Sequence, residues 1–193
     1  MDDLSYISEP TQIAGIAEMS KGLNFGMPSE ALLGCLLKTL VASKPEGRFL
    51  ELGTGTGIAT AWLLSGMDAA SSLVSVDTDL NFQAVAKAVL GSDKRVTFRL
   101  EDGLTFLLSQ KAHTFDMVFA DAMPGKYEGL NDALKVVKVG GFYVIDDMLP
   151  QPNWPEGHAA RIPVLLERLS KHPDFTLLPL VWSSGVAIAV RQR

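Results

Sequence analysis

The sequence predicts an α/β fold: a seven-stranded, mostly parallel sheet with helices on both faces and an antiparallel hairpin strand at the C-terminal end. Runs that are apolar throughout are typical of strands covered on both faces. Parallel strands also need crossover connections of about a dozen residues or more. Five such runs begin 20 to 25 residues apart, at 48–52, 73–77, 96–100, 116–121 and 141–146.

A helical pattern fills each gap between these runs. Strand and helix therefore alternate from residue 48 onward, which is typical of an open parallel sheet. One more helix is expected after the proline-rich loop Pro150–Pro155. The expected helices are Ile58–Met67, Asn81–Leu90, Gly103–Gln110, Glu128–Val137 and Ile162–Lys171.

The chain ends in two further strand-like runs, Phe175–Trp182 and Val186–Val190, separated by Ser183-Ser184-Gly185. A short loop with a glycine between two strands predicts a β-hairpin. A plain dinucleotide-binding sheet would end instead with a sixth parallel strand. The predicted hairpin therefore argues against a plain dinucleotide-binding sheet.

The first 45 residues are expected to be helical, ahead of an α/β core at 46–193. One helix is predicted at Thr11–Lys21 and a second at Ser29–Ser43, with Ser29 as its N-cap. At 193 residues the chain has the length of one domain with a substantial core. We therefore expect residues 1–193 to form a single domain.

The composition is that of a globular protein, with 47% hydrophobic and 20% charged residues and a net charge of −5. No basic block stands out, which argues against a nucleic-acid partner. No apolar run reaches the ~18 residues of a membrane span, and the acidic start Met1-Asp2-Asp3 is unlike a signal peptide. The single cysteine, Cys35, fits a reducing compartment, so a cytoplasmic protein is expected.

The first apolar run leads directly into three glycines, Gly53, Gly55 and Gly57, that alternate with threonines. Glycine tolerates positive φ and lets a ligand approach the backbone, and the following helix presents free N–H groups. A strand, a glycine loop and a helix in this order predict a nucleotide pocket. The alternatives are a structural turn and a variant dinucleotide site, although the dinucleotide fingerprint has its third glycine one position later.

Acidic residues stand at the end of each of the five parallel strands. Because ligands bind outside the carboxyl ends of such strands, these acids are expected to form a rim around one crevice. Asp77 suits two ribose hydroxyls, Asp102 suits an adenine amine, and Glu51 suits either an ammonium group or the glycine turn itself. The alternative is that the acids are helix N-caps and turn residues. The acids are Glu51, Asp77, Glu101, Asp102, Asp121, Asp146 and Asp147.

The pattern E-x-G-x-G-x-G over Glu51–Gly57 resembles motif I of the class I S-adenosylmethionine-dependent methyltransferases. Together with the terminal hairpin, this resemblance implies a Rossmann-like methyltransferase sheet and S-adenosylmethionine as the cofactor. An NAD-linked oxidoreductase with the same pocket is the competing interpretation. The glycine spacing and the hairpin argue against it.

Nearly the whole chain resembles a narrower group, the cation-dependent small-molecule O-methyltransferases, which includes catechol and caffeoyl-CoA O-methyltransferases and their bacterial relatives. Besides motif I, the resemblance rests on Phe115–Ala122, Gly140–Asp147 and the short loop Met27–Glu30. It implies that the cofactor is bound by Met27, Ser29, Glu51, Gly53, Thr54, Gly55, Gly57, Asp77, Thr78, Asp102, Gly103 and Asp121.

In that family a divalent ion is held by an Asp after the fourth strand and an Asp-Asn pair after the fifth. The matching residues are Asp121, Asp146 and Asp147, and the third departs from the family's Asn. Oxygen ligands suit Mg²⁺ or Mn²⁺. Neighbouring strand residues point to opposite faces, so Asp146 and Asp147 can share an ion only if the strand has already turned there.

The family often has a lysine base three residues after the fourth-strand Asp, where this chain has Pro124. Lys126 lies two positions later and is the candidate base, with Asp121 as the second catalytic residue. The expected acceptor is a small hydroxylated molecule, with aromatic vicinal diols as the natural case when an ion is bound. A non-catalytic S-adenosylmethionine-binding relative stays open, because both the lysine position and the Asn have changed.

The loop Met148–His158 follows the proposed metal pair, and its Trp154 either walls the acceptor pocket or anchors the loop. Relatives often dimerise, and the apolar N-terminal helices would suit a homodimer. A small-molecule substrate remains the main expected partner.

Overall fold

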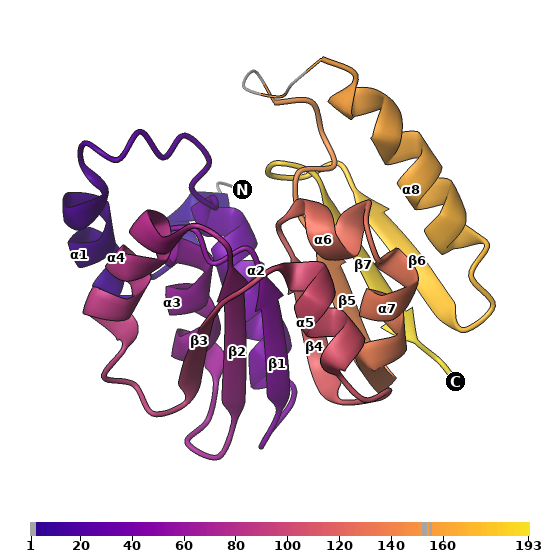
Figure 1. Ribbon diagram of the computed structural model, residues 1–193, viewed down its shortest axis with the longest axis horizontal. Helices are drawn as coiled ribbons and strands as arrows, with labels where there is room; N and C mark the ends of the chain where they lie inside the picture. The colour runs from indigo at the N-terminus through magenta and orange to yellow at the C-terminus, as the bar shows by residue number, and fades with distance from the viewer. Residues whose placement is uncertain (1–2, 152–153, 155) are drawn as a thin grey trace.

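The computed structural model describes residues 3–151, 154 and 156–193. Its strands are β1 (Arg48–Leu52), β2 (Ser72–Asp77), β3 (Val96–Leu100), β4 (Phe115–Ala120), β5 (Val137–Ile145), β6 (Phe175–Leu180) and β7 (Val186–Arg191). They form one sheet in the order β3-β2-β1-β4-β5-β7-β6 (Figure 1). β1 to β5 pair in parallel, whereas β7 is antiparallel to both β5 and β6. The predicted mostly parallel sheet and its C-terminal hairpin are thus confirmed.

Helices cover both faces of this sheet (Figure 1). One core lies under α1 (Gln12–Ser20), α2 (Ala31–Ala42), α3 (Ile58–Gly66) and α4 (Leu80–Leu90). The other lies under α5 (Gly103–Ser109), α7 (Leu130–Val136) and α8 (Arg161–Ser170). The short elements are η1 (Asp3–Tyr6), α6 (Met123–Lys126) and η2 (His158–Ala160).

Alternation along each strand divides the apolar side chains between the two cores. In β5, Tyr143 and Ile145 belong to the core under α7 and α8, while Val144 between them belongs to the core under α2 and α3. All three side chains are fully buried. This double coverage is why the parallel strands read as continuous apolar runs rather than as alternating ones.

The predicted N-cap of the second N-terminal helix is wrong by one residue. α2 begins at Ala31, and the N-cap position is held by Glu30 in an extended conformation without a side-chain cap. Ser29 stays outside the helix. The periodic spacing of the leucines predicted the helix itself correctly. Ser29 is a residue type that favours the N-cap position, but it precedes the residue that holds that position.

The boundary between the predicted helix Glu128–Val137 and the next strand is also wrong. α7 covers Leu130–Val136 only, and β5 starts at Val137, four residues before the predicted start. Val137 pairs with Phe115, and the register then shifts before Met117 pairs with Phe142. β5 therefore runs through Gly140 and Gly141 with an irregularity in its pairing to β4.

The terminal hairpin joins β6 to β7, with Leu180 paired to Val186 across the predicted loop. Within the proline-rich loop, Pro152 and Pro155 lie outside the described residues, as do Met1 and Asp2 of the acidic start. Across the part of the chain that the structure describes, no helix has both the length and the apolar character needed to cross a membrane.

Candidate active site

The glycine loop connects β1 to α3 at the carboxyl edge of the sheet. Gly53 has φ +100° and Gly57, at the N-cap of α3, has φ +98°, a region that favours glycine. A Cβ atom on Gly53 would lie 2.7 Å from the carbonyl oxygen of Asp121. The loop therefore passes directly against the end of β4, and only glycine fits between them.

A cavity of about 320 Å³ opens above this loop. Its wall includes Met27 and Ser29 from the segment before α2, the glycine loop, and Asp77 and Asp121 from the strand ends. Glu51, Gly57 and Asp102 are absent from the lining. The predicted residues that line it are Met27, Ser29, Gly53, Thr54, Gly55, Asp77, Thr78, Gly103 and Asp121.

Asp77 ends β2 and fixes the backbone on both sides of the cavity. Its Oδ2 accepts from the Gly55 N–H at 2.8 Å, and its Oδ1 accepts from the Asp79 N–H at 2.8 Å. Each carboxylate oxygen keeps a second lone pair for a ligand hydroxyl. One side chain thus orders the glycine loop and presents acceptors to the cavity.

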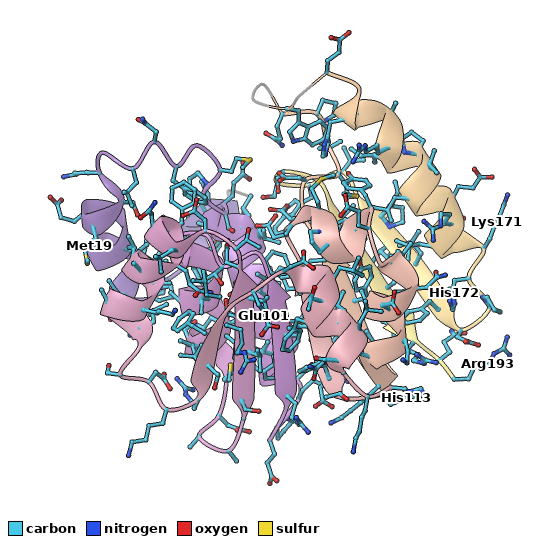
Figure 2. The ribbon with its side chains drawn as sticks, in the orientation of Figure 1. Met19, Glu101, His113, Lys171, His172 and Arg193 are labelled. Carbon is cyan, nitrogen blue, oxygen red and sulfur yellow. The ribbon has the colours of Figure 1, made fainter. Side chains whose placement is uncertain are left out.

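The acid that faces the cavity after β3 is Glu101 rather than Asp102. Asp102 is the N-cap of α5, where its Oδ1 accepts from the Thr105 N–H at 2.7 Å and from the Thr105 hydroxyl at 2.9 Å. These hydrogen bonds lower the pKa of Asp102. Glu101 lines the cavity on the connection from β3 to α5, near the middle of the view in Figure 2. Asp102 therefore acts as a helix N-cap, the alternative that the sequence left open, and it does not line the cavity.

Glu51 is sealed beneath the glycine loop instead of facing the crevice. It is fully buried, and its Oε2 accepts from the hydroxyls of Thr60 and Ser75, each at 2.5 Å. Its Oε1 has no hydrogen-bond partner among the described residues. Burial is the main cause that raises the pKa of Glu51 to about 8. Of its two predicted roles, fixing the turn is the one that these contacts support.

We expect Glu51→Gln to flatten the pH dependence of stability. The folded-state pKa is raised from 4.5 to about 8, so this group stabilises the fold fully below pH 4.5 and loses that contribution as the pH rises toward 8. Glutamine imitates the protonated acid. Between about pH 5 and 8 the wild type should lose on the order of 3 kcal/mol more than the variant. Urea unfolding across this range measures the difference, with exposed Glu46→Gln as control. Parallel pH curves for wild type and Glu51→Gln would contradict the assignment.

Two aromatic residues that the sequence did not single out line the same cavity. The rings of Phe25 and Phe82 lie 4.9 Å apart, and a Cβ atom on Gly55 would meet the Phe25 ring at 2.7 Å. Phe25 belongs to the loop before α2, and Phe82 to the first turn of α4. The sequence marks the loop Asn24–Pro28 as one that could touch a ligand or simply connect two helices, but no spacing in it brings these two rings together.

Asp121, Asp146 and Asp147 come together where β4 and β5 end. Each offers a carboxylate oxygen, and these three oxygens lie within 4.8 Å of one another. Asp147 has φ +57°, so the chain turns directly after β5 and both neighbouring carboxylates reach the same point. Burial, and after it the charge of the Asp147 carboxylate, raise the pKa of Asp146. The pKa of Asp121 is raised in the same direction, with burial again the main cause.

Lys126 reaches this acidic group despite its late position in the sequence. Its Nζ lies 3.4 Å from Oδ1 of Asp121, and the lysine side chain is 7% exposed. Between the two residues, Pro124 (ψ 135°) and Gly125 (φ 89°) leave the helical conformation and interrupt α6. This kink accommodates the two residues by which Lys126 lies later in the sequence than the lysine of the family.

A second cavity, of about 290 Å³, lies on the other side of the acids. It shares Met27, Asp121 and Asp147 with the first cavity. Gln151 and Ser184 line it as well, and the Ser184 hydroxyl donates to Asp146. Its fourth carboxylate, Glu30, accepts from the Ser183 hydroxyl. The two cavities thus meet at the acidic group.

Trp154 anchors its loop by packing. It is not one of the described residues that line either cavity. Its ring lies 4.6 Å from that of His158 and packs against the core under α8. The Nε2 atom of His158 lies 3.3 Å from the Tyr127 hydroxyl, and the Arg161 guanidinium lies over the Tyr127 ring, 5.5 Å from its centroid. This cluster ties the segment after β5 to the end of α6.

Comparison with known proteins points to one family. The model of a family described as a methyltransferase domain matches residues 50–148. A protein of Mycobacterium sp. (strain KMS), named "Putative O-methyltransferase", is 29% identical over 147 residues, which cover 72% of this chain and 65% of that protein. This chain therefore spans less than two thirds of that relative's length.

Solved structures share the fold at low sequence identity. The O-methyltransferase TomG of Streptomyces achromogenes, described as involved in tomaymycin synthesis and crystallised with S-adenosylmethionine, superposes with a TM-score of 0.81 at 22% identity, covering 97% of this chain and 92% of TomG. Cofactor-bound Rv0187 from MTB gives a TM-score of 0.85 at 22% identity, with 99% and 94% covered. At this identity the likeness establishes the Rossmann-like fold alone.

Proposed function

The chain belongs to the methyltransferase-domain family, and on this premise we propose that it is an S-adenosylmethionine-dependent O-methyltransferase of small hydroxylated molecules. The observation that carries the proposal is the junction of two cavities at Asp121 and Asp147. A cofactor in the first cavity and an acceptor in the second would meet there, beside the Lys126 ammonium.

In this proposal the first cavity binds the cofactor. Asp77 accepts from the ribose hydroxyls, while Phe25 and Phe82 supply an apolar wall next to the glycine loop. Asp121 lines the same cavity at the end of β4, and Met27 and Ser29 line the side of the cavity before α2. When bound, S-adenosylmethionine supplies a methyl group already activated on a sulfonium, which the acceptor oxygen takes up as the thioether leaves.

Asp121, Asp146 and Asp147 fit a divalent cation. Their donors are all oxygens, which Mg²⁺ and Mn²⁺ prefer, and they converge within 4.8 Å. Asp147 in place of the family's Asn adds a negative charge and keeps an oxygen ligand. A bound cation would lower the pKa of an acceptor hydroxyl and favour two neighbouring hydroxyls on the acceptor.

Lys126 is the proposed general base. Its ε-amino group takes the proton of the acceptor hydroxyl, and Asp121 holds that group at the junction of the cavities. The Lys126 side chain is only 7% exposed, which limits the access of bulk water to that proton transfer. Gln151 and Ser184 offer polar contacts for the part of the acceptor that lies farther from the methyl group.

Calorimetric titration with S-adenosylhomocysteine tests the cofactor, with NAD as the control ligand. We expect micromolar affinity for the first and no heat from the second.

After EDTA treatment, Mg²⁺ added to the complex should give a binding heat that Asp146→Asn weakens. Labelled methyl transfer to a panel of catechols, with singly hydroxylated analogues alongside, then tests the acceptor class.

Each competing function predicts a different outcome of these titrations and transfer assays. Heat from NAD alone would overturn the proposal in favour of an oxidoreductase. S-Adenosylhomocysteine binding with no transfer to any hydroxylated acceptor would favour a non-catalytic binding protein. A transferase that is unaffected by EDTA would keep the function and remove the cation from it.

A further inference from the structure

The turn that carries Lys126 is held from below by one buried hydroxyl. Tyr143 lies in β5, where it pairs with Val118 of β4 and Ala189 of β7, and its side chain is fully buried. Its hydroxyl donates to the Gly125 carbonyl. Strand alternation places Tyr143 on the face of the sheet that α5 and α7 cover, which is the face under α6.

Gly125 has no freedom to adjust its contacts. Its φ of 89° is left-handed, and a Cβ atom there would lie 2.7 Å from Cδ1 of Leu52. Its N–H donates to the Glu128 carbonyl at 2.7 Å. Because the Gly125 carbonyl accepts from the Tyr143 hydroxyl, both backbone polar groups of this buried residue are paired. The peptide that precedes Lys126 is therefore fixed in position and orientation.

We propose that the Tyr143 hydroxyl is a positioning group for Lys126. By holding the Gly125 carbonyl it sets the direction in which the chain leaves the Pro124–Gly125 kink, and this direction brings Nζ of Lys126 to 3.4 Å from Asp121. Tyr127 is held on the following side by His158 and Arg161. The lysine thus sits between two anchored neighbours. The expected effect on kcat rests on the proposed function of Lys126 as a base. The position of the Lys126 side chain does not depend on that function.

The test compares Tyr143→Phe with Tyr6→Phe, a matched change on η1 at a residue that is 82% exposed. Lys126 acylation by a small activated ester, quantified by mass spectrometry, should become about five-fold faster in Tyr143→Phe and stay unchanged in Tyr6→Phe. With a working acceptor, kcat should fall about ten-fold or more, because a misplaced group costs rate. KM for S-adenosylmethionine should stay within about two-fold, since Asp77 and the glycine loop are untouched.

Unchanged Lys126 acylation in a folded Tyr143→Phe protein would overturn the proposal, and so would an unchanged kcat. If the wild type methylates no acceptor, the proposed function fails and the acylation rate alone decides the role of Tyr143. If Tyr143→Phe does not fold, 4-fluorophenylalanine at position 143 replaces it, because it fills the volume of the hydroxyl but cannot donate. The same faster acylation is then expected, and wild-type acylation would refute the role.

Discussion

Replacing Lys126 with methionine should lower kcat by about 10²- to 10⁴-fold, the range that a general base contributes. Methionine keeps the length and apolar stem of the buried side chain, so the kink at Gly125 should survive. S-Adenosylhomocysteine affinity should change by less than about two-fold, because Lys126 does not line the first cavity. Single-turnover methyl transfer together with calorimetry separates these two effects.

The chain offers a control for this variant in a second lysine–aspartate ion pair. Lys138 of β5 forms an ion pair with Asp116 of β4 at 2.7 Å, at the beginning of β4 rather than at its carboxyl end. Lys138→Met should leave kcat unchanged. Lys126→Arg restores the positive charge but cannot serve as a base near neutral pH. Recovery of kcat in Lys126→Arg would show that charge, and not proton transfer, is what Lys126 supplies.

Replacing Asp77 with alanine should weaken S-adenosylhomocysteine binding by about 30- to 1,000-fold. Two hydrogen bonds to a charged group are each worth about 1.5–3 kcal/mol, and only part of that range is lost because water replaces the carboxylate. The Gly55 N–H also loses its partner, which loosens the glycine loop. Calorimetry measures the affinity, and circular dichroism confirms that the variant is folded.

Asp102→Asn is the control that separates the two acids assigned to the nucleoside. Asparagine caps helices as well as aspartate does, so α5 should be retained. The affinity for S-adenosylhomocysteine should stay within about two-fold of the wild type. A loss as large as that of Asp77→Ala would restore the adenine contact first expected of Asp102, and wild-type affinity in Asp77→Ala would remove Asp77 from the site.

The sheet was predictable because its pattern is local. Continuous apolar runs and regular spacing identify covered parallel strands, and the glycine in Ser183-Ser184-Gly185 identifies the hairpin. Boundaries were less predictable where local signals compete. The strand predicted to begin at residue 141 begins at Val137 and runs through Gly140 and Gly141, where its pairing with β4 shifts register.

The candidate site was predictable where residues follow strands directly, as Asp77 and Asp121 do. It was less predictable where neighbouring acids compete for one role, since Asp102 caps a helix while Glu101 faces the cavity. The approach of Phe25 to Phe82, and of Tyr143 to Gly125, depends on how separate elements pack. No spacing along the chain encodes such contacts.

The closeness of Gly53 to Asp121 has a thermodynamic consequence. The Gly53 N–H donates to the Val76 carbonyl at 2.9 Å, and the Asp121 N–H donates to the Leu52 carbonyl at 2.8 Å, so the sheet's hydrogen bonding continues past the strand ends into the loop. The first residues of the loop are therefore already ordered before a ligand arrives. Little conformational entropy remains to be lost at this end of the cavity, so more of the contact energy is available as affinity.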